Sequence, residues 1–345
     1  MSAGLAPEQW DSLEDVPEPS ETQALHGHGE AAASLLAAHR AGRLPHGLIL
    51  GGPRGIGKAT LAFHLARHLL AFPRGEEAPE TFAPIDPASA LFRQVASGAH
   101  PSVLHLTRPF NERTKTFKTV LTVDEVRRVG HFLARTAHDG GYRVVIVDPA
   151  DDMNVGAANA LLKSLEEPPP RTVFMLVAHA PARLLPTLRS RSRLVRLAAL
   201  DDNALTRALA PLGAGQPEQA LLNAAGGSVR QALLLMRHGG IEIAQSFLAL
   251  MEKPAFDPLA ALKLADSVTG KGRDAAFTLL REESLNLLTE RAAQAAQARE
   301  LVRADRMARA FGTIKEELQT ASAFNLDRKQ QTMALLREVY TALAA

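Results

Sequence analysis

The sequence predicts an α/β fold with a parallel sheet up to about Leu200, followed by an all-helical remainder. Two observations predict this division. From His46 onward, short apolar runs alternate with amphipathic stretches, which is the pattern of parallel strands joined by crossover helices. After Leu200 the strand-like runs stop, and apolar residues recur at the spacing of a helix.

The expected strands are short runs rich in Val, Ile and Leu, of the kind that is buried on both faces of a sheet. They cover residues 48–50, 102–106, 143–147 and 173–178. The expected covering helices are residues 58–70, 123–137 and 155–167. Residues 72–87 are rich in Pro and Glu, so we expect an irregular insertion there.

With 345 residues the chain is long enough for two or three domains, each with a hydrophobic core. Residues 1–25 are acidic and contain three prolines, so we expect a flexible tail. Residues 26–200 are expected to form the sheet domain and residues 201–240 a small helical lid. Residues 241–345 are expected to form a third, helical domain.

Composition excludes several classes of function. The chain has no cysteine, which excludes disulfides, thiolate zinc sites and cysteine nucleophiles. The sequence shows neither a run of about 18 apolar residues nor a signal-like start, so we expect a cytoplasmic protein without membrane contact. The net charge of +2 argues against strong nucleic-acid binding by the chain alone.

A glycine-rich loop, residues 52–60, follows the first expected strand and leads into a helix, which is the context of a phosphate-binding loop. Glycines let backbone N–H groups turn toward phosphate oxygens, and the lysine can bridge the outer phosphates. The residues expected to bind nucleotide in this loop are Gly52, Gly55, Gly57, Lys58 and Thr60.

Two positions that handle the metal in phosphate-loop hydrolases carry unsuitable residues. Ala59 stands where a Ser or Thr hydroxyl would ligate Mg²⁺. Asp148 ends an expected strand and is a candidate nucleotide-site residue, but Pro149 follows it where hydrolases carry a glutamate. We therefore expect no ATP hydrolysis by this chain and weak or absent ATP binding. The nearby Asp151 and Asp152 are interpreted as charges that complement a helix dipole.

Two stretches resemble the bacterial AAA+ clamp-loader subunits of DNA polymerase III. The first, residues 148–169, reads DPADDMNVGAANALLKSLEEPP, and the second, residues 188–192, reads LRSRS and is similar to the Ser-Arg-Cys motif of those subunits. The resemblance is dense over residues 46–196 and only architectural over the last hundred residues. A damaged phosphate loop beside an intact Ser-Arg pair is most similar to the members of the family that do not hydrolyse ATP.

The resemblance implies an AAA+ domain, a helical lid and an all-α collar domain. It also implies partners: the gamma/tau and delta subunits, the sliding clamp, and primed DNA in the assembled complex, within a polymerase holoenzyme. Arg191 is then implied to be an arginine finger that reaches the nucleotide pocket of a neighbouring subunit. Arg230 resembles a second sensor of the lid and is implied to reach the chain's own phosphates.

Other interpretations stay open beside these. Arg191 could belong to a basic surface formed with Arg189, Arg193 and Arg196. The chain could be an active ATPase similar to gamma/tau, which requires Ala59 and Pro149 to be tolerated, or a stand-alone P-loop kinase. The family commonly carries a four-cysteine zinc module after its first helix, but this chain has residues 72–87 there and no zinc is expected. Glu166 and its neighbour Glu167 are interpreted as a solvated helix end.

Overall fold

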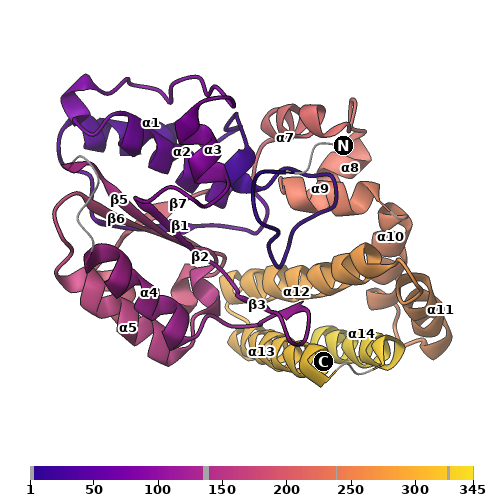
Figure 1. Ribbon diagram of the computed structural model, residues 1–345. Helices are drawn as coiled ribbons and strands as arrows, with labels where there is room; N and C mark the ends of the chain where they lie inside the picture. Colours follow the sequence, from indigo (N-terminus) through magenta and orange to yellow (C-terminus); the bar gives the residue numbers. More distant parts are fainter. Residues whose placement is uncertain (1–3, 135–139, 238, 325–326, 345) are drawn as a thin grey trace. The chain divides into compact units, whose positions relative to one another are not determined.

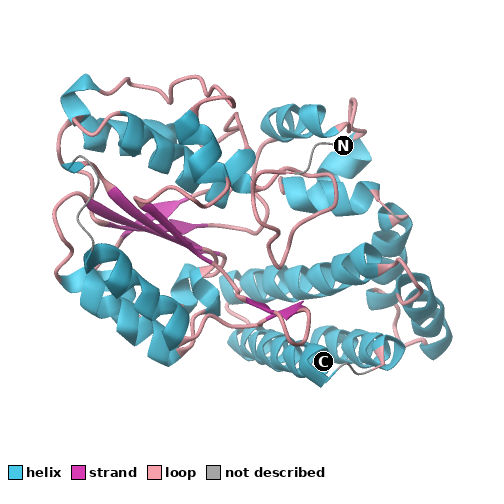
Figure 2. Cartoon of the chain, in the orientation of Figure 1, coloured by secondary structure: helices cyan, strands magenta, loops and turns pink. Residues whose placement is uncertain are grey.

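The computed structural model describes residues 4–134, 140–237, 239–324 and 327–344. Its internal contacts divide the chain into two compact units, one formed by residues 1–216 and 226–229 and the other by residues 217–225 and 230–345. Figures 1 and 2 show the helices and strands of both units. None of the helices in the described ranges combines the length and apolarity that a membrane crossing requires.

The first unit is built on a five-stranded sheet with the strand order β2-β5-β6-β1-β7, in which all neighbours are parallel. The strands are β1 (Gly47–Gly51), β2 (Val103–Leu106), β5 (Arg143–Val147), β6 (Thr172–Ala178) and β7 (Arg193–Arg196). The central strands β1 and β6 are buried along their whole length. The predicted parallel α/β fold is confirmed.

Helices cover both faces of this sheet, as Figure 1 shows. One face carries α1 (Gly29–Arg40), α2 (Lys58–Ala71) and α3 (Ala90–Ala96), and the other carries α4 (Val123–Ala134) and α5 (Val155–Glu166). Along β1 the side chains alternate, so Leu48 and Leu50 join the core under α2 while Ile49 joins the core under α5. Both faces of the strand are apolar because both are covered.

Smaller elements complete the first unit. They are the 3-10 turns η1 (Pro19–Glu21), η2 (Gly75–Glu77), η4 (Ala150–Asp152), η5 (Pro181–Arg183) and η6 (Ala210–Leu212), the helices α6 (Pro186–Ser190) and α7 (Asp202–Leu209), and a hairpin of β3 (Phe110–Asn111) and β4 (Thr116–Phe117). Beyond η2, residues 72–87 have no regular structure, as expected. The last residues of the helix expected at 123–137 lie outside the described residues.

Several elements of the sheet domain were not predicted, among them the edge strand β7 and the helix α1. The edge strand β7 has Arg at both ends and exposed side chains, so it lacks the apolar run that marks a buried strand. The helix α1 precedes the region where we expected regular structure. Its buried residues Ala32, Leu35, Leu36 and His39 fall at helical spacing, which is the pattern that could have revealed it.

The segment expected to be a flexible tail, residues 1–25, makes contacts with the sheet domain in its described part. The Ser20 hydroxyl is buried and donates to the carbonyl of Ala96, 3.2 Å away. The guanidinium of Arg67, on α2, donates to the carbonyls of Ser20 and Thr22 at 2.7 and 3.0 Å. These contacts fix the chain onto the sheet domain, and a composition rich in Pro and Glu does not reveal them.

The second unit contains helices alone among its described residues. They are α8 (Gln219–Ala225), α9 (Val229–Met236, whose first residue belongs to the first unit), α10 (Gly240–Met251), α11 (Pro258–Val268), α12 (Asp274–Gln297), α13 (Leu301–Phe324) and α14 (Arg328–Ala344). The core residues Leu279, Leu280, Leu336 and Val339 are fully buried, at the spacing that predicted these helices. The all-helical C-terminal region is confirmed, whereas the limits of a separate lid stay a prediction.

Candidate functional site

The loop between β1 and α2 has the backbone of a phosphate cradle. Gly55 and Gly57 adopt φ values of +75° and +97°, a conformation that other residues rarely take. A Cβ atom on Gly52 would lie 2.2 Å from the carbonyl oxygen of Leu197, so a side chain has no room there. The structure thus places all three predicted loop glycines where glycine is needed.

Lys58, the first residue of α2, is turned back onto its own loop. Its Nζ donates to the carbonyl oxygen of Gly52 at 2.8 Å and also to that of Pro53. Only 3% of the residue is exposed, and burial lowers the pKa of its amine to about 8. The amine predicted to bind phosphate is therefore hydrogen-bonded to carbonyl groups of its own loop. Thr60 lies two residues further along the helix and is half-buried.

Asp148 lies at the carboxyl end of β5, close enough to Lys58 for the two charges to interact. Burial raises the pKa of its carboxyl to about 7, and the nearby negative charge of Asp11 adds to the rise. At neutral pH a large share of this carboxyl is therefore protonated in the chain without a ligand. With no hydroxyl at Ala59, the residues present do not fit a magnesium–nucleotide complex.

The interpretation of Asp151 and Asp152 as helix-dipole charges is wrong. The N-terminus of α5 is capped by Asn154, whose side-chain oxygen accepts the N–H of Ala157 at 2.8 Å. Asp151 instead accepts the backbone N–H groups of His179 and Ala180, at 2.5 and 3.0 Å, beyond the end of β6. Asp151 therefore stabilises the turn that follows the neighbouring strand.

Asp152 forms a buried ion pair. Its Oδ2 accepts from Nε of Arg108 at 2.6 Å, and the two side chains are 4% and 16% exposed. In the sequence, Arg108 begins a basic cluster at residues 108–118, which is the pattern of a solvated surface. The structure separates it from that cluster, because its guanidinium is fixed at the carboxyl end of the sheet.

Arg191 caps the end of α6, just before the edge strand β7. Its Nη2 lies 3.0 Å from Oε1 of Glu166, and the two side chains are 39% and 48% exposed. Glu166 is therefore an ion-pair partner rather than only a solvated helix end. The backbone of Arg191 passes so close to β1 that a Cβ atom on Gly47 would lie 2.9 Å from its carbonyl oxygen.

Arg230, the predicted second-sensor residue, belongs to the second unit, where it has a carboxylate partner. Its Nε lies 3.2 Å from Oε1 of Glu282 on α12, and both side chains are nearly buried. The adjacent Gln231 donates to Glu283, whose carboxyl has its pKa raised to about 7 by burial and by neighbouring glutamates. No sequence pattern indicates this pairing, because the partner lies 52 residues away.

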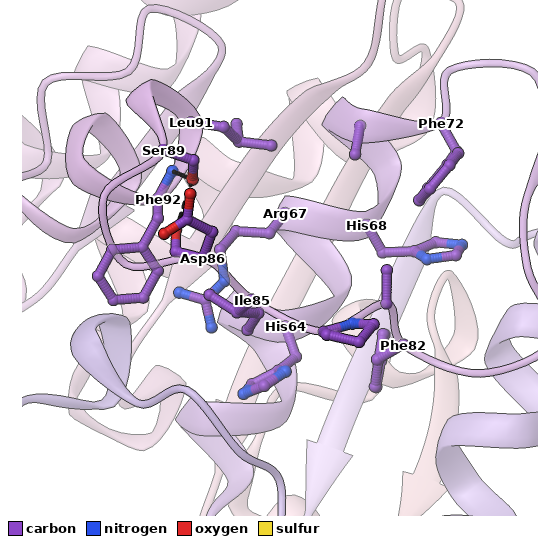
Figure 3. A pocket seen from close by; sticks show the side chains of 13 residues that line it. His64, Arg67, His68, Phe72, Phe82, Ile85, Asp86, Ser89, Leu91 and Phe92 are labelled. Atoms are coloured by element: carbon purple, nitrogen blue, oxygen red, sulfur yellow. Dashed lines mark hydrogen bonds between the residues drawn. The ribbon is translucent and has the colours of Figure 1, made fainter.

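A small pocket lies between α2 and the irregular insertion, where the family commonly carries its zinc module (Figure 3). His64 and His68 line it from one face of α2, and Phe72 and Phe82 are among the other lining residues. Burial lowers the pKa of both imidazoles to about 4, so they are neutral at neutral pH. Within the described ranges, no three His, Asp or Glu side chains gather as a metal site.

The fold and the loop define an α/β protein with a phosphate-loop backbone, in which Ala59 stands where a metal-binding hydroxyl would. The chain belongs to the family described as "DNA polymerase III, delta subunit", whose model matches residues 27–201. The delta prime subunit of Pseudomonas aeruginosa is 42% identical over 146 residues, which is 42% of this chain and 41% of that protein. The delta prime subunit of Escherichia coli is 38% identical over 164 residues, 48% of this chain and 46% of that one.

The relatives also include gamma/tau subunits of DNA polymerase III. The gamma/tau subunit of Mycobacterium tuberculosis is 31% identical over 181 residues, which is 50% of this chain and 28% of that protein. The matched stretch spans less than half of the length of each of these three relatives. The predicted resemblance to clamp-loader subunits, and among them to delta prime, is confirmed.

Proposed function

We propose that this chain is a non-hydrolysing subunit of a clamp loader. In this role it joins gamma/tau and delta subunits and helps to place a sliding clamp on primed DNA. Three observations support the proposal: the kinship with delta prime subunits, the missing metal-handling residues at Ala59 and Pro149, and the state of Lys58, which is bound to its own loop. The helical second unit supplies helices for a collar.

In this proposal, Arg191 of this chain contributes to catalysis at the nucleotide pocket of a neighbouring subunit. An exposed guanidinium at the end of a short helix can enter the nucleotide pocket of the neighbour and neutralise charge that develops on the transferred phosphoryl group. The single observation that supports this step is the exposure of Arg191, which leaves its guanidinium accessible to a neighbouring subunit.

An active gamma/tau-like ATPase is the alternative that kinship leaves open. It requires Mg²⁺ to be held without a hydroxyl at position 59, and it requires water to be oriented without a carboxylate after Asp148. Turnover by the purified chain separates the two functions. We expect no ATPase activity above background with or without primed DNA, and turnover on the order of 1 s⁻¹ would establish the alternative.

The test of Arg191 uses the assembled complex. We expect Arg191→Ala to leave assembly intact and to lower the clamp-dependent ATPase partially, because an arginine finger is worth roughly 10³–10⁵ in rate at one site while the other sites continue. Arg191→Lys should not restore it, since an ammonium lacks the planar fork of a guanidinium. Lys58→Met in the same subunit should change the rate by less than about twofold, because this lysine faces its own loop.

The control for surface charge is Arg193→Ala, on the exposed edge strand β7. It removes the same charge two residues from Arg191, so it should leave the ATPase rate unchanged. Equal losses for Arg191→Ala and Arg193→Ala would show that general surface charge, and not a finger, is responsible. A chain that does not copurify with other clamp-loader subunits would contradict the proposed function itself.

A further inference from the structure

Residues 8–14, the Trp10 segment, contact the charged groups of the phosphate loop. The carboxylate of Asp11 pairs with the guanidinium of Arg54, a loop residue, at 3.1 Å. Asp11 is also close enough to Asp148 to raise the pKa of that carboxyl. The N-terminal segment therefore reaches two parts of the site, the phosphate loop and the acidic end of β5.

Trp10 contacts two arginines of the same site. The guanidinium carbons of Arg54 and Arg108 lie 4.6 and 3.6 Å from the centre of its ring, in cation–π geometry. Arg108 is held in place by its buried ion pair with Asp152, so the indole meets a fixed partner. An aromatic ring beside a carboxylate presents to these arginines the same two kinds of group that a nucleotide presents, a base and an anion.

Charge and tethering both favour this contact. Residues 4–21 carry several acidic side chains, and the chain has no Lys or Arg before Arg40. The segment is anchored just beyond this stretch, where Arg67 binds the carbonyls of Ser20 and Thr22. A tethered ligand competes at a high effective concentration, and no free ligand of the same affinity can match it at low concentration.

We propose that the Trp10 segment is a built-in occupant of the phosphate loop, which excludes phosphate-bearing ligands from it. The damaged metal site is then only part of the reason why this loop does not serve a nucleotide. The other part is competition from the N-terminal segment for Arg54 and Arg108. This inference concerns the isolated chain and does not rest on the clamp-loader proposal.

The experiment measures the binding of inorganic pyrophosphate and of ADP, without metal, to the full-length chain by calorimetry. We expect the double variant Trp10→Ala, Asp11→Ala to bind both probes at least about tenfold more tightly than the wild type, because the apparent affinity falls with the fraction of sites that are covered. Trp10→Ala alone changes no charge and should give part of this gain. Glu14→Ala removes one exposed negative charge of the same segment and should bind within about twofold of the wild type.

Trp10 is the single tryptophan of the chain, so its fluorescence reports the position of the segment directly. In Asp11→Ala, the emission of Trp10 should shift toward that of a solvent-exposed indole. In the wild type, the same shift should appear when saturating pyrophosphate displaces the segment. The proposal fails if the double variant keeps its helical circular dichroism but binds pyrophosphate no more tightly. It also fails if the wild type binds pyrophosphate while the emission of Trp10 stays unchanged.

Discussion

The phosphate loop and the arginine edge, which is Arg191 with its ion-pair partner Glu166, both belong to the sheet domain. They differ in how far their charged groups are buried. At the phosphate loop, Lys58 is 3% exposed and donates to carbonyls of its own loop. At the edge, Arg191 is 39% exposed and its partner, Glu166, is itself 48% exposed. The loop side is enclosed and satisfied internally, whereas the edge side keeps a guanidinium accessible to solvent.

This difference indicates that the residues of a phosphate loop can be held in place by contacts within their own chain. The loop glycines still close the turn from β1 to α2, and the acidic residues after β5 still hold the neighbouring strands together. These residues are needed for folding even without a nucleotide. Arg191 is less enclosed than these residues, and its guanidinium contacts the exposed groups of Glu166, Thr187 and Ser190.

The largest effect that separates the two regions is expected at Asp152. Asp152→Ala removes one partner of a buried ion pair and leaves the guanidinium of Arg108 largely enclosed without it. We expect a loss of about 3 kcal/mol in the free energy of unfolding of the first unit. Urea unfolding followed by Trp10 emission measures this, because Trp10 contacts Arg108.

The matched change is Asp124→Ala, which breaks an ion pair with Arg127 in which both side chains are more than half exposed. Exposed pairs contribute little, so its unfolding midpoint should stay that of the wild type. If the two variants were equally stable, the Asp152–Arg108 pair would contribute no more to stability than an exposed pair. The contrast between this buried pair and the exposed pair at the arginine edge would then be wrong.

A smaller, pH-dependent effect is expected at Asp148. Its pKa is raised to about 7 in the folded chain, so the folded chain keeps a proton that the unfolded chain releases near pH 4. The stability that this proton contributes is fully present below pH 4 and is lost as pH rises through 7. Asp148→Asn does not titrate and should gain about 2 kcal/mol relative to the wild type between pH 5 and pH 8.

Chemical unfolding at these two pH values measures the difference for Asp148→Asn. In a site that binds a metal, the same change would abolish activity. A gain in stability would therefore indicate that the carboxyl of Asp148 serves neither metal binding nor the stability of the fold. Parallel pH profiles for variant and wild type would show instead that Asp148 is ionised throughout, as a functional metal ligand would be.

The smallest effect is expected at the other region. Glu166→Gln removes the ion-pair partner of Arg191 but leaves the arginine in place. An exposed pair is worth at most about 1 kcal/mol, so the ATPase of the assembled complex should fall by no more than about fivefold and stability should not change. Glu167→Gln, at the residue that caps α5, is the control and should have no effect. A loss as large as that of Arg191→Ala would mean that Glu166 acts on the reaction directly.

The sheet could be predicted from the sequence because its buried strands consist of uninterrupted apolar runs, such as β5 and β6. The loop glycines, Lys58 and the missing hydroxyl at Ala59 could be predicted because a phosphate loop is a contiguous motif. The edge strand β7 could not, since a strand with one open edge tolerates Arg at its ends.

The pairings within the site could not be predicted, because each joins residues that are far apart in the chain. Trp10 and Asp11 read as part of an acidic tail until Arg54 and Arg108 are placed against them. Arg230 matches a sensor motif, but its partner Glu282 lies in a region where only helical periodicity could be recognised. A local pattern identifies the residue type that chemistry needs, and only the fold decides what that residue touches.

Gly47, the first residue of β1, leaves room for the backbone of Arg191. Its Cα lies directly under the backbone of Arg191, and any side chain there would press on the carbonyl of Arg191 and on the hydroxyl of Ser192. Substitutions at this position would therefore move the arginine without altering its chemistry. Among related sequences, a glycine kept at position 47 would therefore record whether the position of the guanidinium is still under selection.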